Sequence, residues 1–230
     1  MFTPIVKFHR FLAHQSAYPL LFSSLLAAFF LAGRVLYTRS WDYRTLAWNL
    51  FLAWIPYGCA FLAVALYRLS PKLWWLMLPL GALWLIFFPN APYIVTDFYH
   101  LIERPPVPLW YDIGLIAIFA FSGCFLAIAS LRSMQFLVER YLGKIIGWLF
   151  VMISIGLCGL GIYLGRFGRY NSWDVFFQPY QVMKDLAIRM LNPLDNPRFI
   201  GFTLMFTAIL LVFYLMFASM SRMDQTDRSS

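Results

Sequence analysis

Long runs of apolar residues alternate with short polar connections along this chain. A helix needs about 20 mainly apolar residues to cross the hydrocarbon core of a bilayer. Six segments meet that requirement, which predicts an all-α polytopic membrane protein with six transmembrane helices. The predicted spans are about 18–37, 45–67, 73–95, 110–131, 145–164 and 199–220. We expect residues 1–230 to form a single transmembrane helical domain, with 221–230 as a mobile polar tail.

The third span contains a predicted break. Its apolar part runs for 16 residues from Leu73 to Phe88, about 24 Å of helix, which is shorter than the roughly 30 Å core. Two prolines then flank an asparagine, and proline interrupts the hydrogen bonding of a helix. We therefore expect a helix break at Pro89–Pro92, just inside one membrane interface.

Composition supports this class and excludes others. Hydrophobic residues make up 62% of the chain and charged residues 12%, whereas soluble domains have about 25% charged residues. The net charge of +8 comes from dispersed basic residues, which argues against a nucleic-acid partner. Cys59, Cys124 and Cys158 lie in apolar runs without metal-ligand spacing, so we predict no disulfide and no zinc site.

The distribution of basic residues leaves the orientation undecided. Six spans place both termini on one side, and nine of the 18 basic residues fall on each side of the membrane. Arg166 and Arg169 lie in a polar segment that needs them for reasons other than topology. Without these two, seven basic residues lie on the side opposite the termini and nine on the side of the termini. Because basic residues favour the cytoplasmic side, we expect both termini in the cytoplasm.

The parity of the spans brings several polar segments out on the same membrane face: 41–43, 90–100, 110–112 and 166–174. Trp41, Asp42, Trp110 and Tyr111 are typical of an aromatic belt with headgroup-level charges. Arg34, near the end of the first span, is expected to extend to the headgroups.

The remaining polar residues form the candidate site. Asp97 and His100 are candidate catalytic groups, since these residue types accept or relay a proton. The candidate ligand-binding or phosphate-binding residues are Asn90, Arg166, Arg169, Asn171 and Asp174. A structural alternative is that Arg166 or Arg169 pairs with Asp97 or Asp174. No metal site and no cofactor is predicted, because Asp97, His100 and Glu103 lack a second ligand segment and nucleotide-binding motifs are absent.

Two segments also resemble the signatures of a known family. Residues 85–101 contain Phe-Pro-Asn-Ala-Pro-Tyr followed by Asp97 and His100, and residues 163–174 contain Gly-Arg-Phe-Gly-Arg-Tyr-Asn-Ser-Trp-Asp. They resemble an uncharacterised bacterial family of multi-spanning membrane proteins, a domain of unknown function. That family has a bulky residue at Gly168 and a tryptophan at Tyr170. The resemblance implies an integral membrane protein and implies no activity. We expect the protein to reside in the bacterial inner membrane.

Three functions fit these residues. The first is a non-catalytic partner or assembly subunit, in contact with membrane lipid and with a second copy or other membrane subunits. The second is a membrane-embedded enzyme acting on a lipid headgroup or lipid-linked phosphate. The third is a small-solute or ion transporter that uses the broken span as its binding site. The sequence leaves open whether the protein is an enzyme.

Overall fold

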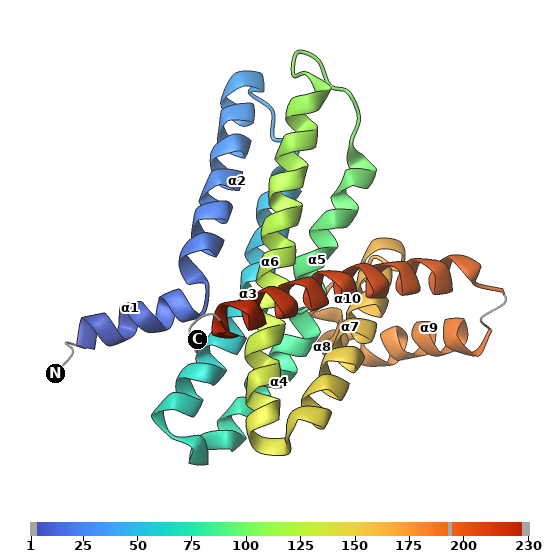
Figure 1. The fold of residues 1–230 in the computed structure, drawn as a ribbon. Helices are drawn as coiled ribbons and strands as arrows, with labels where there is room; N and C mark the ends of the chain where they lie inside the picture. The colour runs from blue at the N-terminus through green and yellow to red at the C-terminus, as the bar shows by residue number, and fades with distance from the viewer. Residues whose placement is uncertain (1–3, 193–194, 227–230) are drawn as a thin grey trace. The chain divides into compact units, whose positions relative to one another are not determined.

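The fold is all-α. The computed structural model describes residues 4–192 and 195–226, and within them the only extended pairing is one bridge between Arg104 and Val107 (Figure 1). The helices are α1 (Pro4–His14), α2 (Ala17–Thr38), α3 (Arg44–Leu69), η1 (Pro71–Leu73), α4 (Trp74–Phe87), α5 (Asn90–Tyr93), η2 (Ile94–His100), α6 (Leu109–Leu142), α7 (Lys144–Phe167), α8 (Asp174–Phe177), α9 (Pro179–Leu191) and α10 (Pro197–Thr226).

Six helical segments of the described residues are long and apolar enough to cross a bilayer. They are Ala17–Thr38, Arg44–Leu69, Pro71–His100, Leu109–Leu142, Lys144–Phe167 and Pro197–Met220. This confirms the predicted polytopic membrane protein with six transmembrane helices.

The predicted break in the third span is also confirmed. Helix α4 ends at Phe87, and α5 begins at Asn90 after a turn. Pro89 and Pro92 have no amide hydrogen to donate to the preceding turn, so the α-helical hydrogen bonding stops here. Beyond Tyr93 the chain continues as the 3₁₀ helix η2, which ends at His100.

Helix α6 extends past Leu131, where the apolar pattern placed the end of the fourth span. It continues to Leu142 and stops at Gly143, whose φ of 93° lies in the region that favours glycine. Hydropathy detects only the apolar part of a helix, so the polar turns that follow gave no indication of a longer helix.

The last helix includes the start of the predicted polar tail. α10 continues to Thr226, while residues 227–230 lie outside the described residues. The mobility predicted for 221–230 stays a prediction.

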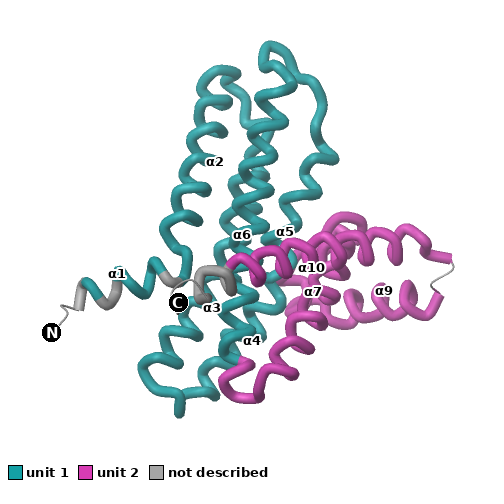
Figure 2. The backbone as a smooth tube through the Cα atoms, viewed as in Figure 1, with its two compact units in different colours: residues 1–137 teal, residues 138–230 magenta. Residues whose placement is uncertain are grey.

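The chain forms two compact units, residues 1–137 and 138–230 (Figure 2). The boundary falls inside α6, so this helix contributes to both. The expectation of a single domain stays a prediction.

In unit 1, α3 packs against α4, α5 and η2. The broken segment also packs closely on α6. A Cβ atom added at Gly123 would overlap the carbonyl oxygen of Ala91, so this contact requires a glycine. Trp84 of α4 donates a hydrogen bond to Ser130 of α6 at 3.2 Å. The polar end of the third span is therefore fixed between two helices.

In unit 2, α7 packs against α10. A Cβ at Gly159 would lie 2.8 Å from the carbonyl oxygen of Thr203, which shows how closely the two backbones approach. Rings from Tyr163, Phe199 and Phe202 pack at the end of this pair, with centroids 5.0 and 5.9 Å from that of Tyr163.

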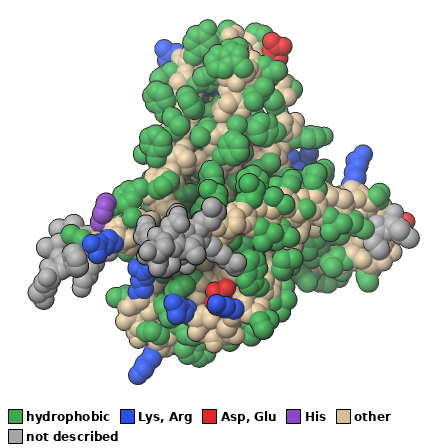
Figure 3. Space-filling view, in the orientation of Figure 1, with side chains coloured by type: hydrophobic (Ala, Val, Ile, Leu, Met, Phe, Trp, Pro, Cys, Tyr) green, Lys and Arg blue, Asp and Glu red, His purple; other side chains and the backbone are tan. Residues whose placement is uncertain are grey.

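Hydrophobic side chains cover most of the visible face of the helices, and the visible charged side chains lie mainly near helix ends (Figure 3). This distribution is the one expected for helices that face lipid along their length.

Candidate functional site

Asp97, the first candidate catalytic group, is buried. It lies on η2, is 6% exposed, and accepts a hydrogen bond of 2.8 Å from the side-chain amide of Asn49. Asn49 occupies the second turn of α3. The carboxylate therefore connects two spans whose sequence positions are 48 residues apart.

The side chain of Asn90 bridges the helix break between α4 and α5. Its side-chain amide donates to the carbonyl oxygen of Phe87 at 3.0 Å, while the backbone amide of Ala91 bonds to Phe88 instead. An unsatisfied carbonyl is costly in lipid. Asn90 thus compensates for a backbone bond that the proline turn removes.

His100, the second candidate catalytic group, does not share the buried environment of Asp97. It is exposed at the end of η2, and its ring packs edge-on against Tyr99 with centroids 6.1 Å apart. Of the two candidate catalytic groups, Asp97 is therefore buried and His100 is exposed. Glu103 lies beyond the end of η2, and among the described residues no group of three or more His, Cys, Asp or Glu side chains is placed to hold a metal ion.

The second candidate segment begins where α7 ends. Gly168 follows the last helical residue, and a Cβ there would lie 2.7 Å from the carbonyl oxygen of Leu164. Arg169 then adopts a left-handed conformation with φ 58°, and the amide of Tyr170 donates back to Leu164 at 3.3 Å. The exposed side chain of Arg169 is placed by this turn, while Arg166 is half-buried in the last turn of α7.

Asp174 completes that segment through local bonds. Its carboxylate accepts a hydrogen bond from the backbone amide of Asn171 at 2.7 Å and a longer contact of 3.5 Å from the side chain of the same residue. The two residues are three positions apart, and Asn171 is exposed. Their role in this geometry is to shape the turn before α8.

The candidate residues therefore fall into two sets. Asn90, Asp97 and His100 lie in unit 1, and the other four lie in unit 2. Their convergence at one membrane interface stays a prediction.

The sequence interpretation was wrong about Arg34. Instead of extending to the headgroups, this residue is 2% exposed and forms a bidentate ion pair with Asp112 of α6, which is 0% exposed. Arg34 Nε and Nη2 lie 2.7 and 3.1 Å from the two carboxylate oxygens. Its Nη1 also donates to Asp42 at 3.3 Å. Burial of a charge is tolerated because its partner is buried with it.

Two aromatic contacts extend this cluster. The guanidinium carbons of Arg34 and Arg104 lie 4.6 and 4.9 Å from the ring centroid of Tyr43. Hydrogen bonding from Ser40 and Arg34 holds the pKa of Asp42 below its ordinary value, and burial raises the pKa of Tyr43. The cluster ties the connections 39–43 and 101–108 to the ends of α2 and α6.

One indication of this cluster was present in the sequence. Arg34 lies three residues before the end of the predicted span 18–37, and Asp112 is the third residue of the predicted span 110–131. Opposite charges at one membrane face, each inside a span, indicate a pair. Asn49 was likewise overlooked as the partner of Asp97.

Comparison with known proteins places the chain in a family. Residues 48–213, more than two thirds of the chain, match a family described as protein of unknown function, DUF1361. The chain belongs to this family. No curated protein and no solved structure matches it. The predicted membership of an uncharacterised family of domain-of-unknown-function proteins is confirmed. Asn49, Asp97 and Asp112 lie inside the matched range, and Arg34 and Asp42 precede it.

Proposed function

We propose that this protein is a non-catalytic integral membrane protein that acts as a subunit of a membrane assembly. The observation that carries the proposal is that Asp97 is buried and hydrogen-bonded to another span. A general base must reach the proton that it removes, but this carboxylate is 6% exposed and bonded to Asn49 of another span. Its geometry is that of a group that holds helices together.

The other carboxylates support the same interpretation. Asp112 neutralises Arg34 inside unit 1, and Asp174 shapes a turn with Asn171 in unit 2. Polar contacts of this kind fix which helices pair and in which register within a bilayer. Each of these acidic groups serves the fold of its own unit.

The spans differ in how much of their surface the chain itself covers. In the most apolar window of each span, 61% of the residues are buried in α6, compared with 22% in α2, 17% in the broken third span and 22% in α10. The less covered spans leave most of their surface for neighbours in the membrane. In this proposal the neighbours are lipids and a second copy or other membrane subunits.

A second candidate is an enzyme acting on a lipid-linked phosphate, favoured by Arg169. This residue is exposed and held at a φ of 58°, and unusual backbone conformations of non-glycine residues are frequent at functional sites. In that case Arg166 and Arg169 hold the phosphate, and exposed His100 acts as the base. In either case we propose residence in the bacterial inner membrane with cytoplasmic termini.

Asp97→Asn, Asp97→Ala and Arg169→Ala separate the two functions, with exposed Asp195→Ala as the control. We expect Asp97→Ala to lower thermal stability in nanodiscs and to weaken complementation of a deletion strain in proportion to the loss of folded protein. Arg169→Ala and Asp195→Ala should leave both unchanged. Full stability with lost complementation in Asp97→Asn or Arg169→Ala would favour the enzyme.

The assembly itself is tested by native mass. Tagged protein extracted gently from membranes should migrate well above the mass of one 26.9 kDa chain with its detergent. A discrete multiple of the chain indicates a homo-oligomer, and a stoichiometric second protein indicates another subunit. Only monomers at every extraction condition would contradict the assembly proposal.

A further inference from the structure

An apolar groove lies between α2 and α3 of unit 1. It has a volume of about 560 Å³ and is lined by apolar side chains, among them Ala28, Leu36, Trp41, Ala47, Trp54 and Phe119. Phe119 comes from α6, so three helices contribute. At the end near Ala28, the indole of Trp54 donates to Ser24 of α2 at 3.1 Å, which joins the two helices where the lining stops.

The length of the groove matches one leaflet. Its lining on α2 runs from Ala28 to Leu36, about 12 Å of helix, and Arg39 lies one turn farther, at about 16 Å. Half of the hydrocarbon core is about 15 Å thick. The groove therefore extends from headgroup level toward the middle of the bilayer.

Both walls of the groove lead to an arginine at headgroup level. On α3, Arg44 precedes Ala47, Phe51 and Trp54 at spacings of three, seven and ten, which is one face of a helix. At the end of α2, Arg39 is the C-cap residue, three positions after Leu36, and its left-handed φ of 56° ends the helix there. Arg39 and Arg44 are both exposed.

The charges around this end are unequal. Asp42, between the two arginines in sequence, accepts a hydrogen bond from buried Arg34, whose other partner is Asp112. Arg104 lies over the ring of Tyr43 and acts on the charge of Asp42, so two arginines balance the two aspartates of this cluster. Arg39 and Arg44 therefore add net positive charge at the surface. Trp41 lines the groove and is 66% exposed, as is usual for tryptophan at headgroup level.

We propose that the groove is a binding site for an anionic phospholipid. One acyl chain lies along α2 and α3, and the phosphate contacts the guanidinium groups of Arg39 and Arg44. Arginine binds phosphate with two parallel hydrogen bonds, and two such residues favour a headgroup with net negative charge over a zwitterionic one.

The charge at the end of the groove favours a phospholipid over a partner helix. The groove is apolar along its length, and the exposed Arg39 and Arg44 follow at headgroup level. A phospholipid presents an acyl chain and then a phosphate in the same order.

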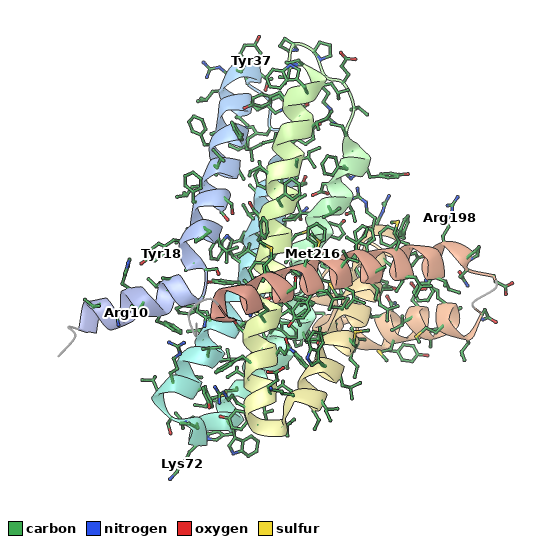
Figure 4. The ribbon with its side chains drawn as sticks, viewed as in Figure 1. Arg10, Tyr18, Tyr37, Lys72, Arg198 and Met216 are labelled. Carbon is green, nitrogen blue, oxygen red and sulfur yellow. The ribbon has the colours of Figure 1, made fainter. Side chains whose placement is uncertain are left out.

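Native mass spectrometry of the purified full-length protein tests the proposal, with phosphatidylglycerol and phosphatidylcholine of identical acyl chains as probes. We expect one phosphatidylglycerol to bind about tenfold more tightly than phosphatidylcholine, and Arg39→Ala/Arg44→Ala to abolish that preference. Arg198→Ala, which removes an exposed arginine of α10 (Figure 4), is the matched control and should keep it.

A second variant separates the apolar groove from the arginines. Ala47→Trp fills the groove from an exposed position of α3, and should reduce binding of both lipids while the helical circular dichroism stays unchanged. Equal binding of the two lipids by the wild type, or an unchanged preference in the arginine variant, contradicts the proposal. So does a change of oligomeric state without loss of lipid in Ala47→Trp, because that result assigns the groove to a protein partner.

Discussion

The two polar segments of this protein use the same residue types in opposite ways. In unit 1, Asp97 is buried and accepts a hydrogen bond from Asn49, 48 residues away. In unit 2, Asp174 is half-buried and accepts from exposed Asn171, three residues away. An aspartate and an asparagine thus join two spans in one region and shape one turn in the other.

The difference shows that burial decides what a polar pair contributes. A bond formed away from water leaves an unsatisfied group when it is broken, whereas water replaces a lost bond at an exposed turn. Unit 1 therefore depends on its polar residues for folding. The exposed groups of unit 2 are the ones that a ligand can reach without disturbing the fold.

The largest expected effect concerns the buried ion pair of unit 1. Asp112→Leu leaves the guanidinium of Arg34 buried with only Asp42 as a carboxylate partner among its observed contacts. We expect a loss of about 3–5 kcal/mol in unfolding free energy, measured by denaturant titration in detergent. Arg34→Met/Asp112→Leu should recover most of that loss, because an apolar pair replaces the charges. A double variant as unstable as the single one would show that the charges themselves are required.

The next effect tests the comparison directly. Asp97→Ala should reduce unfolding free energy by about 1–3 kcal/mol, because it removes a buried acceptor and leaves the amide of half-buried Asn49 without this partner. Asp174→Ala should cost less than about 1 kcal/mol, since water can reach Asn171. A double-mutant cycle with Asn49→Ala measures the coupling. Equal losses at the two aspartates would remove the distinction between the segments.

Close helix packing provides a test that involves no charge. Gly123→Ala places a methyl group against the carbonyl oxygen of Ala91, and we expect a loss of about 1–3 kcal/mol. Gly156→Ala is the matched control in α7, because nothing lies within 4 Å of its Cβ position. There the gain in helix propensity, up to about 1 kcal/mol, should raise the melting temperature. A neutral Gly123→Ala would mean that the broken segment shifts to accept the methyl group.

The smallest effect is a dependence on pH at Asp42. Hydrogen bonding from Ser40 and Arg34 lowers the pKa of this carboxyl in the folded protein. Such a group stabilises the fold above its ordinary pKa of about 3.9 and loses that contribution as pH falls through the folded pKa. Wild-type stability should therefore fall more than that of Asp42→Asn below about pH 4. Parallel curves from pH 7 to 3 would contradict this.

The apolar pattern predicted the spans and the break well. Hydropathy reports which segments are apolar enough to cross a bilayer, and Pro89 and Pro92 remove amide hydrogens whatever their surroundings, so both features are local. The rotation of a helix about its axis depends on the helices packed against it, and the residues of the helix alone do not determine it. For that reason the sequence placed Arg34 at the headgroups, whereas the structure turns it toward Asp112.

The candidate site shows the same limit. Sequence spacing placed Asp97 and His100 together, but could not say that packing against α3 buries one while the chain exposes the other. The family resemblance was informative because it depends on residue order alone. Tertiary partners such as Asn49 came only from the structure.

The length of α6 has a consequence for topology. Its 34 residues form a rod about 51 Å long, which a core of about 30 Å cannot contain. Its final turns must therefore emerge into water or headgroups beside Leu142, which is 60% exposed. A cysteine introduced there offers a labelling point for membrane-impermeant reagents, and reaction in whole cells or only in inverted vesicles assigns the compartment in which the protein begins.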